Sequence, residues 1–177
     1  MTVGFEESIG FLGGSYARDK DAVVASMLIA EMTAYYKAKN MTLLDALEAL
    51  YKKYGFSAEV NLEVHMEGVD GPERMEALMA SLRASTPSEI GGVSVSVFGD
   101  YTTESFTNMI SGEKTPTGLP KANVLVYNLE GGSQVVVRPS GTEPKIKLYY
   151  LIQSDTEENA HKTLESIKLA VTNYLDI

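Results

Sequence analysis

Residues 56–66 read FSAEVNLEVHM, and this stretch decides the fold of the larger part of the chain. Every second residue from Phe56 to Met66 is apolar, and the residues between them are Ser, Glu, Asn or His. A period of two over this length is typical of a β-strand with one buried face, because successive side chains point to opposite sides of a strand. The stretch therefore predicts a half-buried strand, with a domain boundary at its start.

The sequence after this strand continues with a helix, four β-rich runs and a final helix. Gly131-Gly132 is a turn signal, so the runs on either side of it should pair as a hairpin. This order predicts an α+β domain, in which an antiparallel or mixed sheet is covered on one face by two helices. Residues 99–121 are rich in Gly, Pro, Thr and Ser and predict an irregular excursion. The expected elements are a helix that begins near Pro72, strands at 93–97, 123–129, 134–138 and 145–152, and a final helix capped by Asp155 and Glu158.

The residues before this domain predict a smaller, helical region. The first eighteen are rich in glycine and serine and indicate a loop. Asp19 is expected to cap a first helix, and Thr42 with Asp45 resembles the capping box of a second helix. Gly55 then suits the residue after that helix, because glycine accepts a left-handed conformation. We therefore divide the chain into residues 1–55, a loop plus two helices, and residues 56–177.

The composition excludes several classes of site and partner. The formal net charge is −9 and no long cluster of Lys or Arg is present, so DNA or RNA binding is not expected. The absence of cysteine excludes disulfides and thiolate metal sites, and 2 histidines cannot form a His-rich metal site. No apolar run is long enough to span a membrane and no signal peptide is recognisable, so the expected location is the cytoplasm. Any anionic ligand must be met by a local cluster of donors, because the overall field repels it.

Residues 138–145 read RPSGTEPK and form the sharpest chemical motif of the chain. A phosphate is bound by short donors that converge on one point, namely a guanidinium group, hydroxyls and free backbone N–H groups. Arg138 supplies the guanidinium, and Ser140 and Thr142 supply hydroxyls. Gly141 lets the backbone approach a ligand closely or turn at positive φ. The motif therefore predicts a phosphate-binding loop between two strands.

Lys147 adds a further cation to this segment. It lies two residues beyond Lys145 and should point to the same face of the strand. The alternative interpretation of the whole segment is a tight connection between two strands with a solvated arginine.

Two weaker motifs lie near the amino terminus. Residues 4–10 read GFEESIG, in which Glu6 and Ser8 can point to the same side. A carboxylate such as that of Glu6 can accept hydrogen bonds from two neighbouring hydroxyls of a sugar. Residues 18–21 read RDKD at the start of a helix, where Arg18 or Lys20 could reach the phosphate of a ligand. A solvated acidic loop and a charged helix cap are the respective alternatives.

Taken together, these motifs resemble the alpha-D-phosphohexomutase superfamily of phosphoglucomutases and phosphomannomutases. Residues 4–10 with 18–21 are similar to the sugar-specificity loop of the family's third domain, and 138–145 are similar to the phosphate-binding loop of its fourth domain. The resemblance covers essentially the whole chain, although Ala22 stands where the family pattern has glycine. It implies that Glu6, Ser8 and Lys20 bind the sugar substrate, and that Arg138, Ser140, Gly141, Thr142 and Lys147 hold the phosphate that is not transferred.

The resemblance also implies what the chain lacks. Family catalysis uses a phosphoserine loop and an Asp-rich Mg²⁺ loop, and neither motif occurs in this sequence. We therefore expect no catalytic and no metal-binding residue here, and an inactive fragment of a longer enzyme that uses Mg²⁺ and a hexose 1,6-bisphosphate. The fragment would comprise the end of the sugar-binding third domain, a helical remnant of an α/β fold, and a complete fourth domain of the TATA-binding-protein-like fold.

A different class of function stays open at this point. The chain could be a free-standing phosphosugar-binding or assembly module without enzymatic activity. Expected partners are a phosphorylated sugar, the missing N-terminal domains of a mutase, or a second copy of the chain in a homodimer. Phosphoserine and metal motifs in the upstream gene sequence would favour the enzyme fragment.

Overall fold

The computed structural model describes residues 3–6 and 9–175. By its internal contacts the chain divides into two compact units, Met1–Tyr54 and Gly55–Ile177, which are described separately. None of the helices within the described residues is both long enough and apolar enough to cross a membrane.

The first unit begins with a small β-hairpin. Strands β1 (Val3–Glu6) and β2 (Gly10–Gly13) pair antiparallel, with Phe5 opposite Phe11. The prediction of a loop over the first eighteen residues was therefore wrong in this part. Strands of four residues are too short to give a clear period of two, and their glycines are typical of loops rather than strands.

Two helices complete the first unit. Helix α1 (Ala22–Lys37) is capped by Asp21, whose carboxylate accepts from the amides of Val23 and Val24, so the expectation that Asp19 caps it was wrong. Helix α2 (Leu43–Tyr54) begins with the predicted capping box. The Thr42 amide donates to Asp45 at 2.7 Å, and the Asp45 amide donates to the Thr42 hydroxyl at 3.1 Å.

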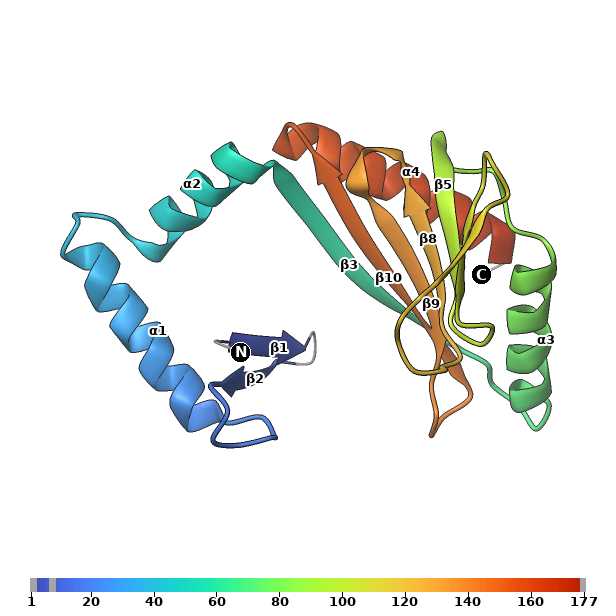
Figure 1. Ribbon diagram of the computed structural model, residues 1–177, viewed down its shortest axis with the longest axis horizontal. Coiled ribbons are helices and arrows are strands. Elements are labelled where there is room, and N and C mark those ends of the chain that lie inside the picture. The colour runs from blue at the N-terminus through green and yellow to red at the C-terminus, as the bar shows by residue number, and fades with distance from the viewer. Residues whose placement is uncertain (1–2, 7–8, 176–177) are drawn as a thin grey trace. The chain divides into compact units, whose positions relative to one another are not determined.

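The second unit is built on an eight-stranded sheet in which every pairing is antiparallel. The order along the sheet is β3-β10-β9-β8-β5-β6-β7, and β4 pairs with β5 (Figure 1). The predicted hairpin across Gly131-Gly132 is confirmed as the pairing of β8 with β9. The strands are β3 (Phe56–His65), β4 (Glu89–Ile90), β5 (Val93–Asp100), β6 (Ser105–Asn108), β7 (Lys114–Pro116), β8 (Leu125–Leu129), β9 (Gln134–Pro139) and β10 (Lys145–Ser154).

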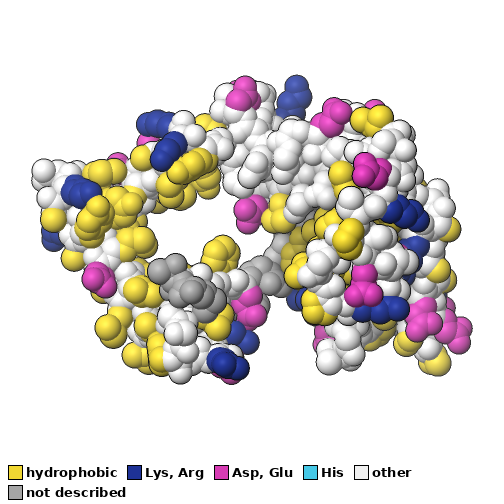
Figure 2. All heavy atoms as spheres, viewed as in Figure 1, with side chains coloured by type: hydrophobic (Ala, Val, Ile, Leu, Met, Phe, Trp, Pro, Cys, Tyr) yellow, Lys and Arg dark blue, Asp and Glu magenta, His cyan; other side chains and the backbone are white. Residues whose placement is uncertain are grey.

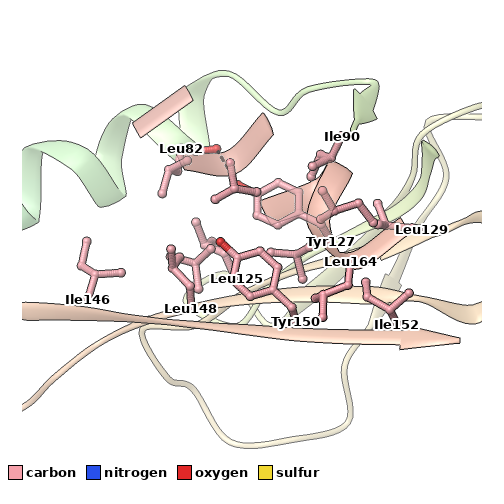
Figure 3. Packing of buried hydrophobic residues seen from close by; sticks show 14 of the residues in the cluster. Leu82, Ile90, Leu125, Tyr127, Leu129, Ile146, Leu148, Tyr150, Ile152 and Leu164 are labelled. Carbon is pink, nitrogen blue, oxygen red and sulfur yellow. Dashed lines mark hydrogen bonds between the residues drawn. The ribbon is translucent and has the colours of Figure 1, made fainter. Parts of the chain in front are cut away.

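Helices α3 (Gly71–Ala84) and α4 (Glu157–Leu175) pack on one face of this sheet and close its hydrophobic core. Every second residue of β10 from Ile146 to Ile152 is fully buried and belongs to the same cluster as Met79, Leu82, Leu164 and Ile167 (Figure 3). The α+β fold class with an antiparallel sheet under two helices is thus confirmed. The cap of α4 is Thr156, which accepts from the Asn159 amide at 3.2 Å, rather than Asp155.

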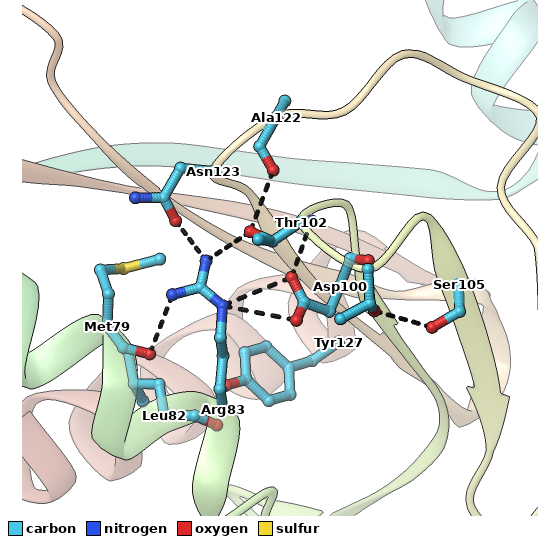
Figure 4. A network of polar contacts seen from close by, with 10 residues as sticks. Met79, Leu82, Arg83, Asp100, Thr102, Ser105, Ala122, Asn123 and Tyr127 are labelled. Atoms are coloured by element: carbon cyan, nitrogen blue, oxygen red, sulfur yellow. Dashed lines mark hydrogen bonds and ion pairs between the residues drawn. The ribbon is translucent and has the colours of Figure 1, made fainter.

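Residues 99–121 are more regular than the sequence indicated. They contain the end of β5 and the short strands β6 and β7, which extend the sheet at one edge. These strands are short and largely polar, so they carry no clear hydrophobic period. A polar network around Arg83 of α3 holds this segment in place. Arg83 contacts Asp100, Thr102 and Asn123 (Figure 4).

Candidate phosphate-binding site

The RPSGTEPK motif forms the turn of the β9–β10 hairpin. Arg138 is still a residue of β9, and Lys145 is the first residue of β10. The Ser140 amide donates to the Lys145 carbonyl at 2.8 Å, and the Lys145 amide donates to the Glu143 carbonyl at 2.8 Å. Residues 140–144 therefore form a tight loop on a rigid two-stranded support.

Strand register places Arg138 and Lys147 in one row across the sheet. Lys147 of β10 lies directly opposite Arg138 of β9 on one side and Glu63 of β3 on the other. Directly opposite residues share a face, with Cβ atoms about 4.5–5.5 Å apart. Since Ile146 and Leu148 face the core, this row lies on the face of the sheet away from the helices. The prediction that Lys145 and Lys147 share a strand face is consistent with this register.

The base of the loop is anchored to the connection between β3 and α3. The Met66 amide donates to the Pro144 carbonyl at 2.8 Å. A Cβ on Gly71 would lie 2.2 Å from the Met66 carbonyl oxygen and 3.3 Å from Cβ of Pro144, so only glycine allows these segments to approach. The loop is thus held by a strand that lies far away in the sequence.

Ion pairs surround the lysines of the site. Lys145 Nζ lies 2.7 Å from Glu143 and 2.9 Å from Glu63, and Lys147 Nζ lies 3.4 Å from Glu63. The hydrogen bonds that Lys145 donates to Glu143 and Glu63 raise the pKa of Lys145 and lower the pKa of both carboxyls. His65 Nε2 lies 3.6 Å from the same Glu63 carboxylate.

The remaining donors of the loop reach solvent. Gly141 and Thr142 are exposed and Ser140 is half-buried. The Thr142 amide lies 3.4 Å from the Ser140 hydroxyl oxygen, a long contact that a ligand oxygen could replace. Gly141 does not adopt positive φ, and a Cβ there would meet no atom within 4 Å, so the proposed turn at positive φ was wrong. Close approach of the backbone to a ligand at Gly141 stays a prediction.

In the first unit, the structure brings together two of the residues expected to bind the sugar. Lys20 Nζ lies 3.5 Å from the Glu6 carboxylate and 3.5 Å from that of Asp19, and this proximity raises the pKa of Lys20. Gly10 makes the contact possible, because a Cβ there would lie 2.5 Å from Lys20 Cγ and 2.6 Å from Glu6 Oε1. Ser8 lies outside the described residues.

Sequence reasoning missed the acidic half of the phosphate site. Glu63 was assigned only to the polar face of its strand, and its contact with Lys145 depends on the register of strands that are 82 positions apart. Glu143 lies inside the motif but was given no role. Acidic residues beside a run of cations were the available signal, and they do not by themselves specify which pairs form.

The described residues offer no arrangement of ligands that suits Mg²⁺. Across residues 3–6 and 9–175, the structure contains no group of three or more Asp, Glu or His side chains arranged to hold a metal ion. The carboxylates Glu63 and Glu143 are bound to Lys145 instead. We therefore assign no metal-dependent step to the described residues.

Comparison with known proteins supports one family for both units. The family model for phosphoglucomutase/phosphomannomutase, alpha/beta/alpha domain III, matches residues 1–54. The model for the phosphoglucomutase/phosphomannomutase C-terminal domain matches residues 29–168. The structure of the exocytosis-sensitive phosphoprotein pp63/parafusin, a phosphoglucomutase from Paramecium, aligns in its open form with a TM-score of 0.57 and 15% identity. That alignment covers 96% of this chain and 28% of the Paramecium protein.

Curated relatives with recognisable sequence similarity include phosphoglucomutases of Staphylococcus aureus. The protein of strain bovine RF122 / ET3-1 is 38% identical over 149 residues, which is 84% of this chain and 27% of the relative. The protein of strain MRSA252 is 36% identical over 163 residues, which is 92% of this chain and 29% of the relative. The chain therefore spans less than a third of the length of these relatives. On the match of its C-terminal residues above all, the chain belongs to the phosphoglucomutase/phosphomannomutase family.

Proposed function

We propose that this chain provides the C-terminal substrate- and phosphate-recognition part of a phosphoglucomutase/phosphomannomutase-type enzyme. The observation that carries the proposal is the placement of Arg138 and Lys147 side by side next to the Ser140–Thr142 turn. A guanidinium, an ammonium, two hydroxyls and free amides at the end of a rigid hairpin suit a phosphate group. Two family models and the Staphylococcus relatives support the same proposal.

Within the parent enzyme, we infer the roles of the residues from the resemblance of their motifs to those of the family. Arg138, Ser140, Gly141, Thr142 and Lys147 hold the phosphate of the sugar that is not being transferred. Glu6, Ser8 and Lys20 contact the sugar, because a carboxylate can accept hydrogen bonds from neighbouring hydroxyls. The chain positions a hexose phosphate, and the phosphoserine, the Mg²⁺ ion and the bisphosphorylated sugar intermediate belong to chemistry supplied by other parts of the parent.

The apolar surface of the first unit supports the need for such other parts. Large apolar side chains of α1 and α2, including Val23, Met27, Leu44 and Leu50, are exposed. Figure 2 shows hydrophobic side chains gathered along these two helices. The matching family domain is an alpha/beta/alpha fold, so we propose that the rest of that domain in the parent covers this surface. A homodimer of the chain is the competing arrangement.

A phosphate titration followed by NMR tests the loop directly. Inorganic phosphate should shift the amides of residues 140–145 with roughly millimolar affinity, because the charge-assisted hydrogen bonds are offset by the lost freedom of the ligand and by the acidic net charge. Arg138→Ala should abolish these shifts. Lys162→Ala, on the exposed side of α4, removes the same charge and should leave them unchanged. Shifts that persist in Arg138→Ala would show that the loop only connects two strands.

The isolated chain should have no mutase activity of its own. A coupled assay with glucose 1-phosphate, glucose 1,6-bisphosphate and Mg²⁺ should show no turnover above buffer, since the donor serine loop and the metal loop of the family do not occur in the sequence. Turnover that depends on this chain would contradict the assignment of catalysis to other parts of a parent enzyme.

A further inference from the structure

Glu63 occupies a central position among the charges of the phosphate site. Its Oε2 atom lies 2.9 Å from Lys145 Nζ and 3.6 Å from His65 Nε2, and its Oε1 atom lies 3.4 Å from Lys147 Nζ. One carboxylate on β3 thus contacts both lysines of β10 through different oxygen atoms.

The two lysines are held with unequal strength. Lys145 has a side chain that is 14% exposed, and carboxylates bind it at 2.7 and 2.9 Å, which are distances of strong charge-assisted hydrogen bonds. Lys147 is 33% exposed and has one carboxylate at 3.4 Å, which is long for such a bond. A phosphate would have to displace two carboxylates to reach Lys145, whereas it could bind Lys147 beside the existing contact.

We propose that Glu63 is a positioning residue of the phosphate site. With Glu143 it binds Lys145 and so links the loop to β3, and from the β3 side it fixes the position of Lys147, which lies between Glu63 and Arg138 in the sheet. Arg138 and Lys147 are then the side-chain cations that meet the phosphate, while Lys145 does not touch it. The inference rests on the proposed function, namely that the 140–144 loop binds phosphate.

The charge balance of the cluster explains how the ion pairs of Lys145 with Glu63 and Glu143 help the site. Three cationic and two anionic side chains leave a single net positive charge when His65 is neutral: Arg138, Lys145 and Lys147 against Glu63 and Glu143. The whole chain has a net charge of −9, so a cationic site without internal carboxylates would attract the protein's other acidic groups. Ion pairs inside the site keep the loop in one conformation and leave the remaining positive charge at the Arg138 end.

Lysine side-chain NMR on the intact chain separates the two lysines. During a titration with inorganic phosphate, the Nζ and Cε signals of Lys147 should move together with the Gly141 amide and saturate at the same concentration. The signals of Lys145 should stay in place. Lys145→Gln and Lys147→Gln provide the assignments. Movement of the Lys145 signals with the Gly141 amide would overturn the inference.

Charge-balanced variants give an independent test by affinity. Lys147→Gln should weaken phosphate binding about tenfold, the usual effect of one charge-assisted hydrogen bond. Lys145→Gln should also weaken it, because Glu63 and Glu143 are then less neutralised beside the ligand. The double variant Glu143→Gln/Lys145→Gln has the same net charge as the unmodified chain. It should restore phosphate affinity to within about threefold of that of the unmodified chain. A double variant as weak as Lys147→Gln would show that Lys145 binds phosphate itself.

The role of Glu63 has its own readout. Glu63→Gln should lower the pKa of Lys145, measured from its Cε signal against pH, and should shift the Lys147 Nζ signal before phosphate is added. The methyl signals of Ile146 and Leu148 in the core should not change, which separates positioning from a general loss of structure. Unchanged signals of both lysines would overturn the assignment to Glu63. If Gly141 does not respond to phosphate in the unmodified chain, the proposed function fails instead.

Discussion

The two units of the chain differ in how completely they bury their own apolar side chains. In the second unit, Leu148, Tyr150, Ile152 and Ile167 are 0% exposed, and the helices and the sheet form one closed core. In the first unit, Val23 and Leu44 are among many large apolar side chains on the surface, at 74% and 72% exposure. Residues 55–177 thus enclose a core of their own, whereas residues 1–54 leave much of their apolar surface exposed.

Helix α1 shows this incompleteness most clearly. Apolar residues lie on more than one side of it, and an apolar groove of about 500 Å³ lies between it and β2, lined by Leu12, Leu28 and Met32 among others. A helix that is apolar on all sides is typical of the interior of a larger domain. The hairpin β1–β2 covers only part of this surface.

Separating the two units gives the largest expected effect. A fragment of residues 55–177 should fold cooperatively, because it keeps the whole core cluster. A fragment of residues 1–54 should be largely unfolded, because short helices without tertiary packing are marginal in water. Circular dichroism with thermal unfolding of each fragment checks this. A cooperative transition in the 1–54 fragment would show that the first unit folds by itself, which contradicts the prediction.

Matched leucine substitutions test the difference in packing between the two units within the intact chain. Leu148→Ala in β10 should lower the free energy of unfolding of the second unit by about 2–5 kcal/mol, through lost burial and a cavity. Leu44→Ala on the surface of α2 should change the free energy of unfolding by less than about 0.5 kcal/mol. Urea unfolding followed by far-UV circular dichroism measures both changes, since the chain has no tryptophan for a fluorescence signal. Similar losses for the two variants would mean that α2 is packed as tightly as β10.

A buried hydroxyl in the second unit gives the smallest expected effect. Within the described part of the chain, the Tyr150 hydroxyl has no hydrogen-bond partner, and burial raises the pKa of Tyr150 to about 12. Tyr150→Phe keeps the ring and removes the unsatisfied group, so it should leave stability unchanged or raise it by about 1 kcal/mol. The thermal midpoint measures the change. A loss of more than about 1 kcal/mol would indicate that the hydroxyl is satisfied in solution.

The sequence predicted the elements that carry a long, clear pattern. The alternation in β3 repeats one signal over many residues, the pair Gly131-Gly132 is a specific turn signal, and both the strand and the hairpin formed. The hairpin β1–β2 and the edge strands β6 and β7 were missed, because strands of three or four residues give no measurable period.

The site was predictable to a similar extent. The RPSGTEPK motif identified the loop because its donors are adjacent in the sequence. Glu63 could not be found in that way, since its contact with the loop depends on strand register and not on spacing. Asp19 was expected to cap α1, but the turn places the cap two positions later, at Asp21, which the pattern of residues does not show.

Hydrogen exchange of the intact chain, measured by mass spectrometry with and without phosphate, tests the difference between the units most directly. Amides of β9, β10 and α4 should exchange only on global unfolding of their domain, and amides of α1 and α2 should exchange at least about a thousandfold faster. Phosphate should slow exchange in residues 140–145 and leave α1 and α2 unaffected. Equal protection of the two units, with no response of the loop to phosphate, would contradict the account of a complete phosphate-binding domain joined to an incomplete one.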